Sequence, residues 1–238
     1  LAGEATEGYE SCRKLLKQRF NSNHAIITSG TTEAIKLVAH AWGESNLQSG
    51  DVVLLTEMEH HSDIVPWQML AERKAIELRY IPVLNGRLDM EAFDVALEDA
   101  KLVCVVHTSN VLGVRNPIEK IIESSKSVGA RVLLDAAQAV PHEEIDFKEL
   151  GADFMAFSAH KMCGPTGIGV LLVSDDAFGE MNPFMGEGDM IETVTLQGST
   201  YQTNEHKFEA GTPRIAEGVG WASALKWLAT VDLASHHK

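Results

Sequence analysis

Lys161 follows an apolar, strand-like run and precedes a glycine-rich turn, in the stretch FSAHKMCGPTGIGVLLV (157–173). An apolar setting lowers the pKa of a lysine amine, and a neutral amine can attack a carbonyl group to form a Schiff base. A lysine on a loop can instead carry its charge out to solvent. The position therefore predicts either covalent amine chemistry or an ordinary surface cation. The turn is not a nucleotide-binding P-loop, because no Gly-Lys-Ser/Thr ends it.

A carboxylate stands in a comparable place, since Asp135 ends the apolar run RVLLD. An unpaired carboxylate is costly to bury, so we expect a cationic partner such as the ring nitrogen of a cofactor. Gln138, a turn later, is placed to bond a second polar atom of the same ring. The alternative is that Asp135 caps the next helix.

Polar residues also follow three other strand-like runs. The stretch SGTTEA (29–34) offers hydroxyls, backbone N–H groups and a helix start to an anion such as phosphate, although Ser/Thr before Glu is also an ordinary helix cap. His60 or His61 could stack on a flat ligand or move a proton, or both could be loop and cap residues. Asn110 is either a ligand partner or a turn former.

The elements that must position these residues alternate between strand and helix patterns. Such an alternation predicts an α/β fold with a mainly parallel sheet sandwiched by helices, and ligands gather at the carboxyl ends of such strands. The Gly/Pro loop between the last two strands predicts an antiparallel addition, and residues 180–213 are the least regular part. The predicted strands are 24–30, 51–57, 76–83, 101–109, 131–139, 153–158 and 167–175. The predicted helices are 1–20, 31–42, 62–75 (opened by a serine cap), 88–100, 116–130 and 214–235.

Composition limits the class of protein. The 238 residues are 45% hydrophobic, which is enough for a sizeable core, and their net charge is −14 with the acidic residues scattered. We therefore expect no nucleic acid and no membrane among the partners. The three cysteines, Cys12, Cys104 and Cys163, match neither a disulfide framework nor a metal site, which favours a cytoplasmic protein without a metal. The missing initial Met indicates a fragment.

Six motifs together resemble one enzyme family. They are SGTTEAIKLVA, EMEHHSDIVPWQ, HTSNVLG, LLDAAQAVPH, FSAHKMCGPTGIGVL and KFEAGTP. In this order they are similar to the cysteine desulfurases that serve iron–sulfur cluster assembly, within the class V aminotransferase family of fold-type I pyridoxal-phosphate enzymes. The resemblance implies that residues 1–238 form the large, cofactor-binding domain of such an enzyme. An N-terminal segment and the small C-terminal domain would then be missing.

The resemblance also implies a role for each candidate residue. Lys161 would hold pyridoxal 5′-phosphate as a Schiff base and then move protons, while His60 would stack on the ring and assist. Asp135 would pair with the ring nitrogen, and Gln138 would bond the phenolic oxygen. The other implied contacts are those of Thr31, Thr32, Ser158 and His160 with the phosphate, of Asn110 with the ring oxygen and substrate carboxylate, and of Thr212 with the phosphate of the second subunit of a homodimer.

The implied reaction converts L-cysteine to L-alanine and leaves a persulfide on a protein cysteine, from which an acceptor protein takes the sulfur. In the family that cysteine, and an arginine for the substrate carboxylate, lie in the small domain. We therefore expect this chain alone not to complete turnover. Cys163 stands where the family usually has an aromatic or apolar residue, so we expect it to be a small buried filler.

Two other functions remain open on the sequence. One is a related lyase that acts on selenocysteine or cysteine sulfinate, because the same cofactor site would support those reactions. The other is a non-catalytic protein that binds pyridoxal phosphate or docks onto a partner.

Overall fold

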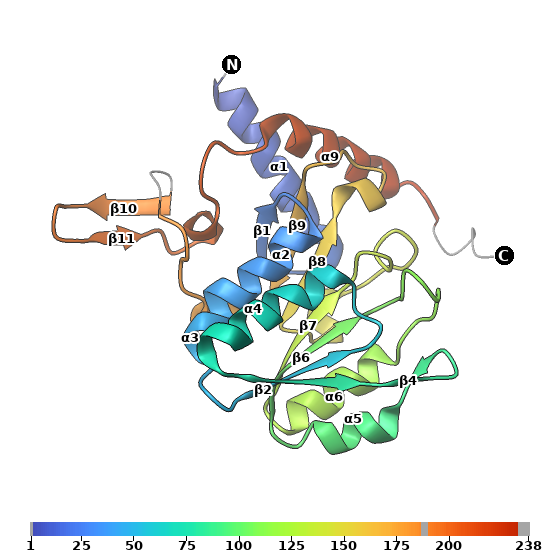
Figure 1. The fold of residues 1–238 in the computed structure, drawn as a ribbon. Coiled ribbons are helices and arrows are strands. Elements are labelled where there is room, and N and C mark those ends of the chain that lie inside the picture. The colour runs from blue at the N-terminus through green and yellow to red at the C-terminus, as the bar shows by residue number, and fades with distance from the viewer. Residues whose placement is uncertain (1, 187–189, 233–238) are drawn as a thin grey trace.

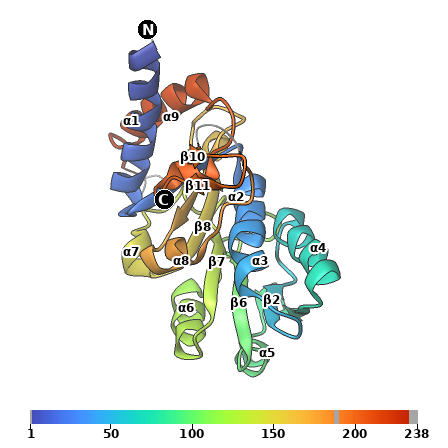
Figure 2. The same cartoon turned by 90° about the vertical axis from the view of Figure 1, so that its left-hand side faces the viewer.

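A mixed sheet forms the middle layer of the molecule and helices cover both of its faces (Figures 1 and 2). The computed structural model describes residues 2–186 and 190–232. In these ranges the sheet has seven strands, which are β1 (His24–Thr28), β2 (Val52–Thr56), β3 (Glu77–Ile81), β6 (Ala100–Val106), β7 (Arg131–Asp135), β8 (Phe154–Ser158) and β9 (Gly169–Val173). Their order across the sheet is β1-β9-β8-β7-β6-β2-β3.

The strand directions confirm the predicted α/β class. Strand β9 runs antiparallel to both β8 and β1, while the neighbours from β3 through β2, β6 and β7 to β8 are parallel. The antiparallel addition predicted from the Gly/Pro loop is therefore present. Because β1 shares the direction of the parallel strands, the carboxyl ends of β1, β2, β6, β7 and β8 all open at one edge of the sheet.

Two layers of helices bury the two faces of the sheet. Alternate side chains of β7 enter opposite cores, with Val132 and Leu134 on one face and Leu133 on the other. The first face is covered by α1 (Ala2–Phe20), α5 (Met90–Ala96), α6 (Ile118–Ser127), α7 (Phe147–Leu150) and α9 (Ile215–Leu228). The second face is covered by α2 (Thr31–Leu37) with its π-helical continuation η1 (Val38–Gly43), by α4 (Val65–Lys74) and by α8 (Asp175–Glu180), while the short α3 (Glu44–Asn46) extends η1 and has no buried residue.

Some predicted boundaries are wrong for local reasons. The predicted helix 62–75 starts as a 3₁₀ turn, η2 (His61–Asp63), and α4 begins only at Val65. Ser62 does not cap α4, because its hydroxyl lies 2.8 Å from Nδ1 of His60 instead. Helix α9 ends at Leu228, and residues 233–235 of the predicted helix lie outside the described residues.

The irregular segment 180–213 contains a hairpin that the sequence did not predict. Its strands β10 (Ile191–Val194) and β11 (Ser199–Tyr201) project away from the body of the molecule (Figure 1). Their side chains are mostly exposed, so no apolar alternation marks them in the sequence. The 3₁₀ turn η5 (Glu205–Phe208) follows. A second hairpin, β4 (Val83–Leu84) with β5 (Arg87–Leu88), closes around a turn at Asn85 and Gly86.

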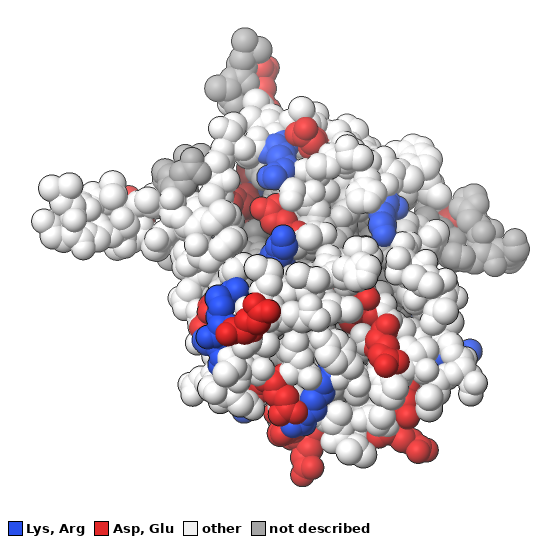
Figure 3. Space-filling view, in the orientation of Figure 1, with Lys and Arg blue, Asp and Glu red and all other residues white. Residues whose placement is uncertain are grey.

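The described surface carries charges of both signs. On the face shown in Figure 3, Lys and Arg side chains lie beside Asp and Glu side chains. Arg73, for example, contacts Glu44, and Arg79 contacts Glu77. Within the described residues no helix is long and apolar enough to cross a bilayer.

Close backbone packing at Gly169 gives a first testable prediction. A Cβ atom at this position would lie 2.5 Å from Gly30 Cα and 2.7 Å from the Phe157 carbonyl oxygen. Since these backbone atoms cannot rotate away, we expect Gly169→Ala to destabilise the protein by about 1–3 kcal/mol in urea denaturation. Gly179→Ala is the control, because a Cβ there meets nothing within 4 Å. Equal stability of the two variants would contradict the close packing.

Candidate active site

At the carboxyl edge of the sheet, Lys161 and His60 lie close enough to Asp135 to interact with it electrostatically. Asp135 ends β7 and lies between Val106 of β6 and Ala156 of β8. Lys161 belongs to a 3₁₀ turn, η3 (Ala159–Lys161), directly after β8. Lys161 and the His60 imidazole both act electrostatically on Asp135. Residues from three strand ends therefore meet at the place where ligands bind in open α/β sheets.

Asp135 is a buried carboxyl with spare acceptor capacity. It is 4% exposed, and its Oδ1 accepts one hydrogen bond of 2.9 Å from the Ala137 backbone N–H. Burial raises the pKa of Asp135, although the Ala137 bond, Lys161 and His60 act against this rise. A carboxyl in this setting gains from a cationic N–H partner, so Asp135 fits the ring nitrogen of a pyridine cofactor.

The surroundings of Asp135 also bear on the helix-cap alternative. Residues 137–140 form a turn rather than a helix, and the Ala137 N–H of this turn donates to the Asp135 carboxylate. Lys161 itself is partly buried, so its amine is neither sealed in the core nor fully solvated. Its position beside Asp135 suits an amine that reacts with a ligand held at this edge.

Two turns meet where the sequence analysis placed an anion site. The Thr31 N–H donates to Ser158 Oγ at 2.8 Å, and the two hydroxyl oxygens lie 2.7 Å apart. Gly30 occupies the N-cap position of α2 without a side-chain cap, and the Glu33 carboxylate reaches back to the Ser29 N–H. Thr31 and Ser158 therefore form a joint hydroxyl pair at the start of a helix.

The other predicted site residues are all at least partly exposed. His160, Thr32 and Asn110 are exposed, and Gln138 is half-buried in the turn after β7. Thr212 is exposed on the loop before α9, where it lines a cavity of about 390 Å³ with residues of α1, β1 and α2. The described residues contain no group of three or more His, Cys, Asp or Glu that could hold a metal ion.

Cys163 differs from its expected role as a buried filler. The side chain is exposed and the residue has a left-handed backbone with φ of 58°. The turn needs this conformation to lead the chain from η3 back toward β9. A tight turn does not require an apolar side chain, which explains why the expectation was wrong.

The sequence analysis missed a buried pair of carboxyl groups. Glu59 and Asp63 flank His60 in the segment EMEHHSD, and both are buried. Their signal is present in the sequence, because Glu59 directly precedes the histidine pair and Asp63 lies two residues after it, but the prediction for this segment concerned only the histidines.

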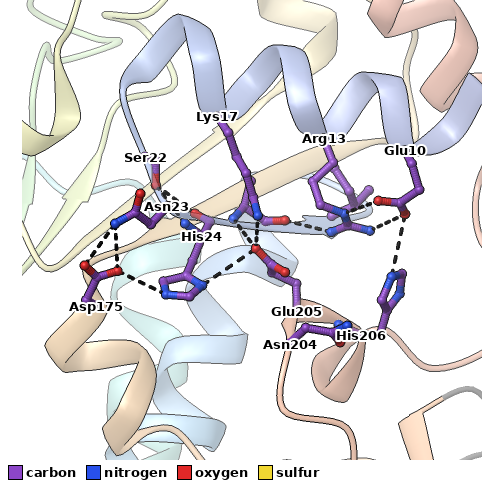
Figure 4. Close-up of polar contacts among 12 residues, drawn as sticks. Glu10, Arg13, Lys17, Ser22, Asn23, His24, Asp175, Asn204, Glu205 and His206 are labelled. Carbon is purple, nitrogen blue, oxygen red and sulfur yellow. Dashed lines mark hydrogen bonds and ion pairs between the residues drawn. The ribbon is translucent and has the colours of Figure 1, made fainter.

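A second missed cluster connects α1 to the segment before Thr212 (Figure 4). Arg13 is 4% exposed and binds both carboxylate oxygens of Glu209, at 2.6 Å and 2.9 Å. Glu209 also accepts a 2.7 Å bond from the Ile27 N–H of β1. Further along, burial opposes ionisation of Glu205, but His24 and Lys17 hold the pKa of that carboxyl below its usual range. The segment 205–209 is thereby fixed against α1 and β1.

Known proteins share this fold and these motifs. The Aminotransferase class-V family matches residues 1–238. A cysteine desulfurase of Haloferax volcanii is 43% identical over 98% of this chain and 56% of that protein. The solved structure of the cysteine desulfurase CsdA of Escherichia coli, with an S-sulfonic acid, is similar with a TM-score of 0.92 and 35% identity, over 98% of this chain and 59% of that one.

A third relative carries the cofactor. It is a variant of the protein C-DES with glycine covalently linked to PLP, at 26% identity and a TM-score of 0.88, over 99% of this chain and 63% of that one. The chain belongs to the class-V aminotransferase family, and its fold is that of the large domain of fold-type I pyridoxal-phosphate enzymes. It spans less than two thirds of the length of these relatives.

Proposed function

We propose that residues 1–238 form the pyridoxal 5′-phosphate-binding large domain of a cysteine desulfurase. The observation that carries this proposal is the buried Asp135 carboxyl beside Lys161 and His60 at the carboxyl edge of the sheet. The names of the relatives from Haloferax volcanii and Escherichia coli support the activity.

We propose a task for each candidate residue. The Asp135 carboxylate holds a proton on the ring nitrogen, and the Lys161 amine holds the cofactor and moves the proton of the substrate Cα. When bound, the cofactor supplies an electron sink for that carbon. His60 covers the ring, Gln138 bonds its phenolic oxygen and Asn110 lies near the substrate carboxylate. The phosphate contacts are those of Thr31, Thr32, Ser158, His160 and, from a second subunit, Thr212.

The substrate is proposed to be L-cysteine, with L-alanine and a sulfur atom on a protein cysteine as the products. A second candidate is a lyase reaction on selenocysteine or cysteine sulfinate. The structural similarity to C-DES, a cystine C–S lyase, supports this lyase reaction as the second candidate. A third is a non-catalytic protein that binds the cofactor or a partner.

The test is to add pyridoxal 5′-phosphate to the full-length protein, which carries the expected small domain as well as these residues, record the visible absorption band, and then supply each substrate. Under the proposal a band appears, and L-cysteine gives alanine and reducible sulfur faster than the selenium and sulfinate analogues do. A band without any product supports the non-catalytic candidate. A protein that stays colourless contradicts the cofactor assignment itself.

Three finer points belong to the same proposal. A homodimer would let the exposed Thr212 reach a second active site, which light scattering with and without Thr212→Ala can examine. The sulfur is proposed to pass to an acceptor protein for iron–sulfur cluster assembly. We place the protein in the cytoplasm because its cysteines show no disulfide pattern.

Replacing Asp135 with asparagine gives the second prediction. The raised pKa of Asp135 in the fold means that its ionised form costs stability as pH rises above the ordinary pKa of about 3.9. Asparagine is therefore expected to keep or raise the stability of the cofactor-free protein at neutral pH. Turnover is expected to fall ~10²-fold, because the ring nitrogen loses its anionic partner. Thermal melts and alanine formation measure the two effects, and unchanged turnover would contradict the role.

A further inference from the structure

Two carboxyl groups are packed together beneath the proposed active site. Glu59 is 7% exposed and Asp63 is fully buried, in the segment that leads from β2 to α4. The two carboxyl groups lie close enough to act on each other directly. His60, which belongs to the proposed active site, lies between Glu59 and Asp63 in the sequence. The two carboxyl groups therefore belong to the segment that positions this histidine.

The hydrogen bonds of this pair do not balance if both groups are ionised. Glu59 Oε1 accepts from the Thr56 hydroxyl at 2.6 Å and from the Val106 N–H at 2.9 Å. Asp63 Oδ1 accepts from the Trp67 indole at 3.0 Å. In the described part of the chain the second oxygens, Glu59 Oε2 and Asp63 Oδ2, have no donor. Carboxylates only accept, so a bond between the two groups requires a proton on one of them.

We propose that Glu59 and Asp63 share one proton, and that this singly charged pair is a positioning element for His60. The assignment of His60 to an active site rests on the proposed function. The shared proton rests only on burial and hydrogen-bond geometry.

The surrounding groups favour retention of the proton. Burial, and then the neighbouring carboxylates including Asp135, raise the pKa of both groups. Two carboxylates in contact cannot both ionise at a buried site. The Cys104 thiol of β6 also contacts Asp63, but a thiol is a weak donor and does not replace the proton. Lys161 and the His60 imidazole act on Asp135, one strand further along.

The same bonds fix the position of His60. Glu59 ties the segment to the backbone of β6, and Asp63 ties it to Trp67 in α4. The His60 Nδ1 accepts from the Ser62 N–H at 3.2 Å, which places the ring proton on Nε2. Glu59 and Asp63 thereby fix the segment on both sides of His60, and Ser62 contacts one ring nitrogen. Among the described residues the other ring nitrogen has no hydrogen bond, so it can face a ligand.

The experiment uses the pH dependence of unfolding in the cofactor-free protein. A proton kept by the fold but lost on unfolding makes stability fall as pH rises above the ordinary carboxyl pKa. The folding constant of the wild type is therefore expected to lose up to tenfold per pH unit between about pH 5.5 and 8 relative to Glu59→Gln or Asp63→Asn. In each variant an amide N–H donates where the proton was, so the fold is kept. Glu123→Gln, at an exposed position on α6, is the control.

The positioning role has its own readout. Glu59→Ala removes the anchor and is expected to lower turnover at least tenfold, whereas Glu59→Gln restores it. The shared proton is disproved if Glu59→Gln and Asp63→Asn both show the same dependence of stability on pH as the wild type and the Glu123→Gln control. Equal turnover of Glu59→Ala and the wild type overturns the positioning role. The pH slope is measured without cofactor or substrate, so it holds or fails independently of the proposed function.

Discussion

Replacing Lys161 with alanine is expected to remove the visible absorption band that pyridoxal 5′-phosphate gives with the protein and to lower turnover ~10⁴-fold. The amine is partly buried beside Asp135, and the structure places no other lysine among the groups that act on that carboxyl in the described residues. Loss of the amine removes both the covalent hold on the cofactor and the group that moves the Cα proton, which alone is worth 10²–10⁴-fold. Absorption spectra and alanine formation measure the two losses.

The matched control is Lys36→Ala, an exposed lysine of the helix that follows the Thr31 turn. It is expected to keep both the absorption band and turnover. A small primary amine added to Lys161→Ala is expected to restore part of the activity, because it supplies the missing base. A normal band in Lys161→Ala would show that another residue holds the cofactor.

The strand ends are the part of the site that the sequence predicts well. Asp135 and Lys161 each follow an apolar run, and parallel strands bring such positions to one edge of the sheet. The observed contact between Thr31 and Ser158 follows from the same rule, although these residues are 127 positions apart. The hydrophobic pattern of the sequence is sufficient to predict these positions, because each residue is placed by a strand that is buried on both faces.

The buried charge clusters lie beyond that kind of reasoning. Arg13 and Glu209 are separated by 196 residues, and each stands in a sequence context typical of a solvated surface. Glu59 also stands in a sequence context typical of a solvated surface, yet it accepts hydrogen bonds from the Thr56 hydroxyl and from the backbone of β6. A charged residue is buried only when its partners are, so its burial depends on the whole fold.

The two clusters also differ in how the fold compensates the negative charge of their carboxylates. Arg13 compensates Glu209 with an opposite charge, so that segment is fixed by ion pairing. Glu59 and Asp63 have no cation among their hydrogen-bond partners, so their charge is limited by protonation. Because Arg13 keeps its charge at neutral and alkaline pH, the Arg13–Glu209 ion pair is expected to persist there, while the anchor of His60 weakens as pH rises.

Replacing Arg13 with methionine is expected to have the largest effect on stability, a loss of about 3–5 kcal/mol in urea denaturation. Methionine fills most of the volume but leaves the Glu209 carboxyl in its buried place, with the Ile27 N–H and the Tyr9 hydroxyl as donors and the His206 imidazole 3.9 Å away. Because Glu209 fixes the loop that carries Thr212, the affinity for pyridoxal 5′-phosphate is expected to fall as well. Equilibrium unfolding and cofactor titration measure the two effects.

Arg79 provides a control of the same residue type. It also binds two carboxylates, those of Glu77 and Asp99, but its side chain is 32% exposed. Arg79→Met is therefore expected to cost less than about 1 kcal/mol. The double variant Arg13→Met/Glu209→Gln is expected to recover part of the loss, since no unpaired charge remains in the core. If Arg13→Met costs no more than Arg79→Met, burial does not strengthen this ion pair, and the segment 205–212 must be held by its apolar contacts instead.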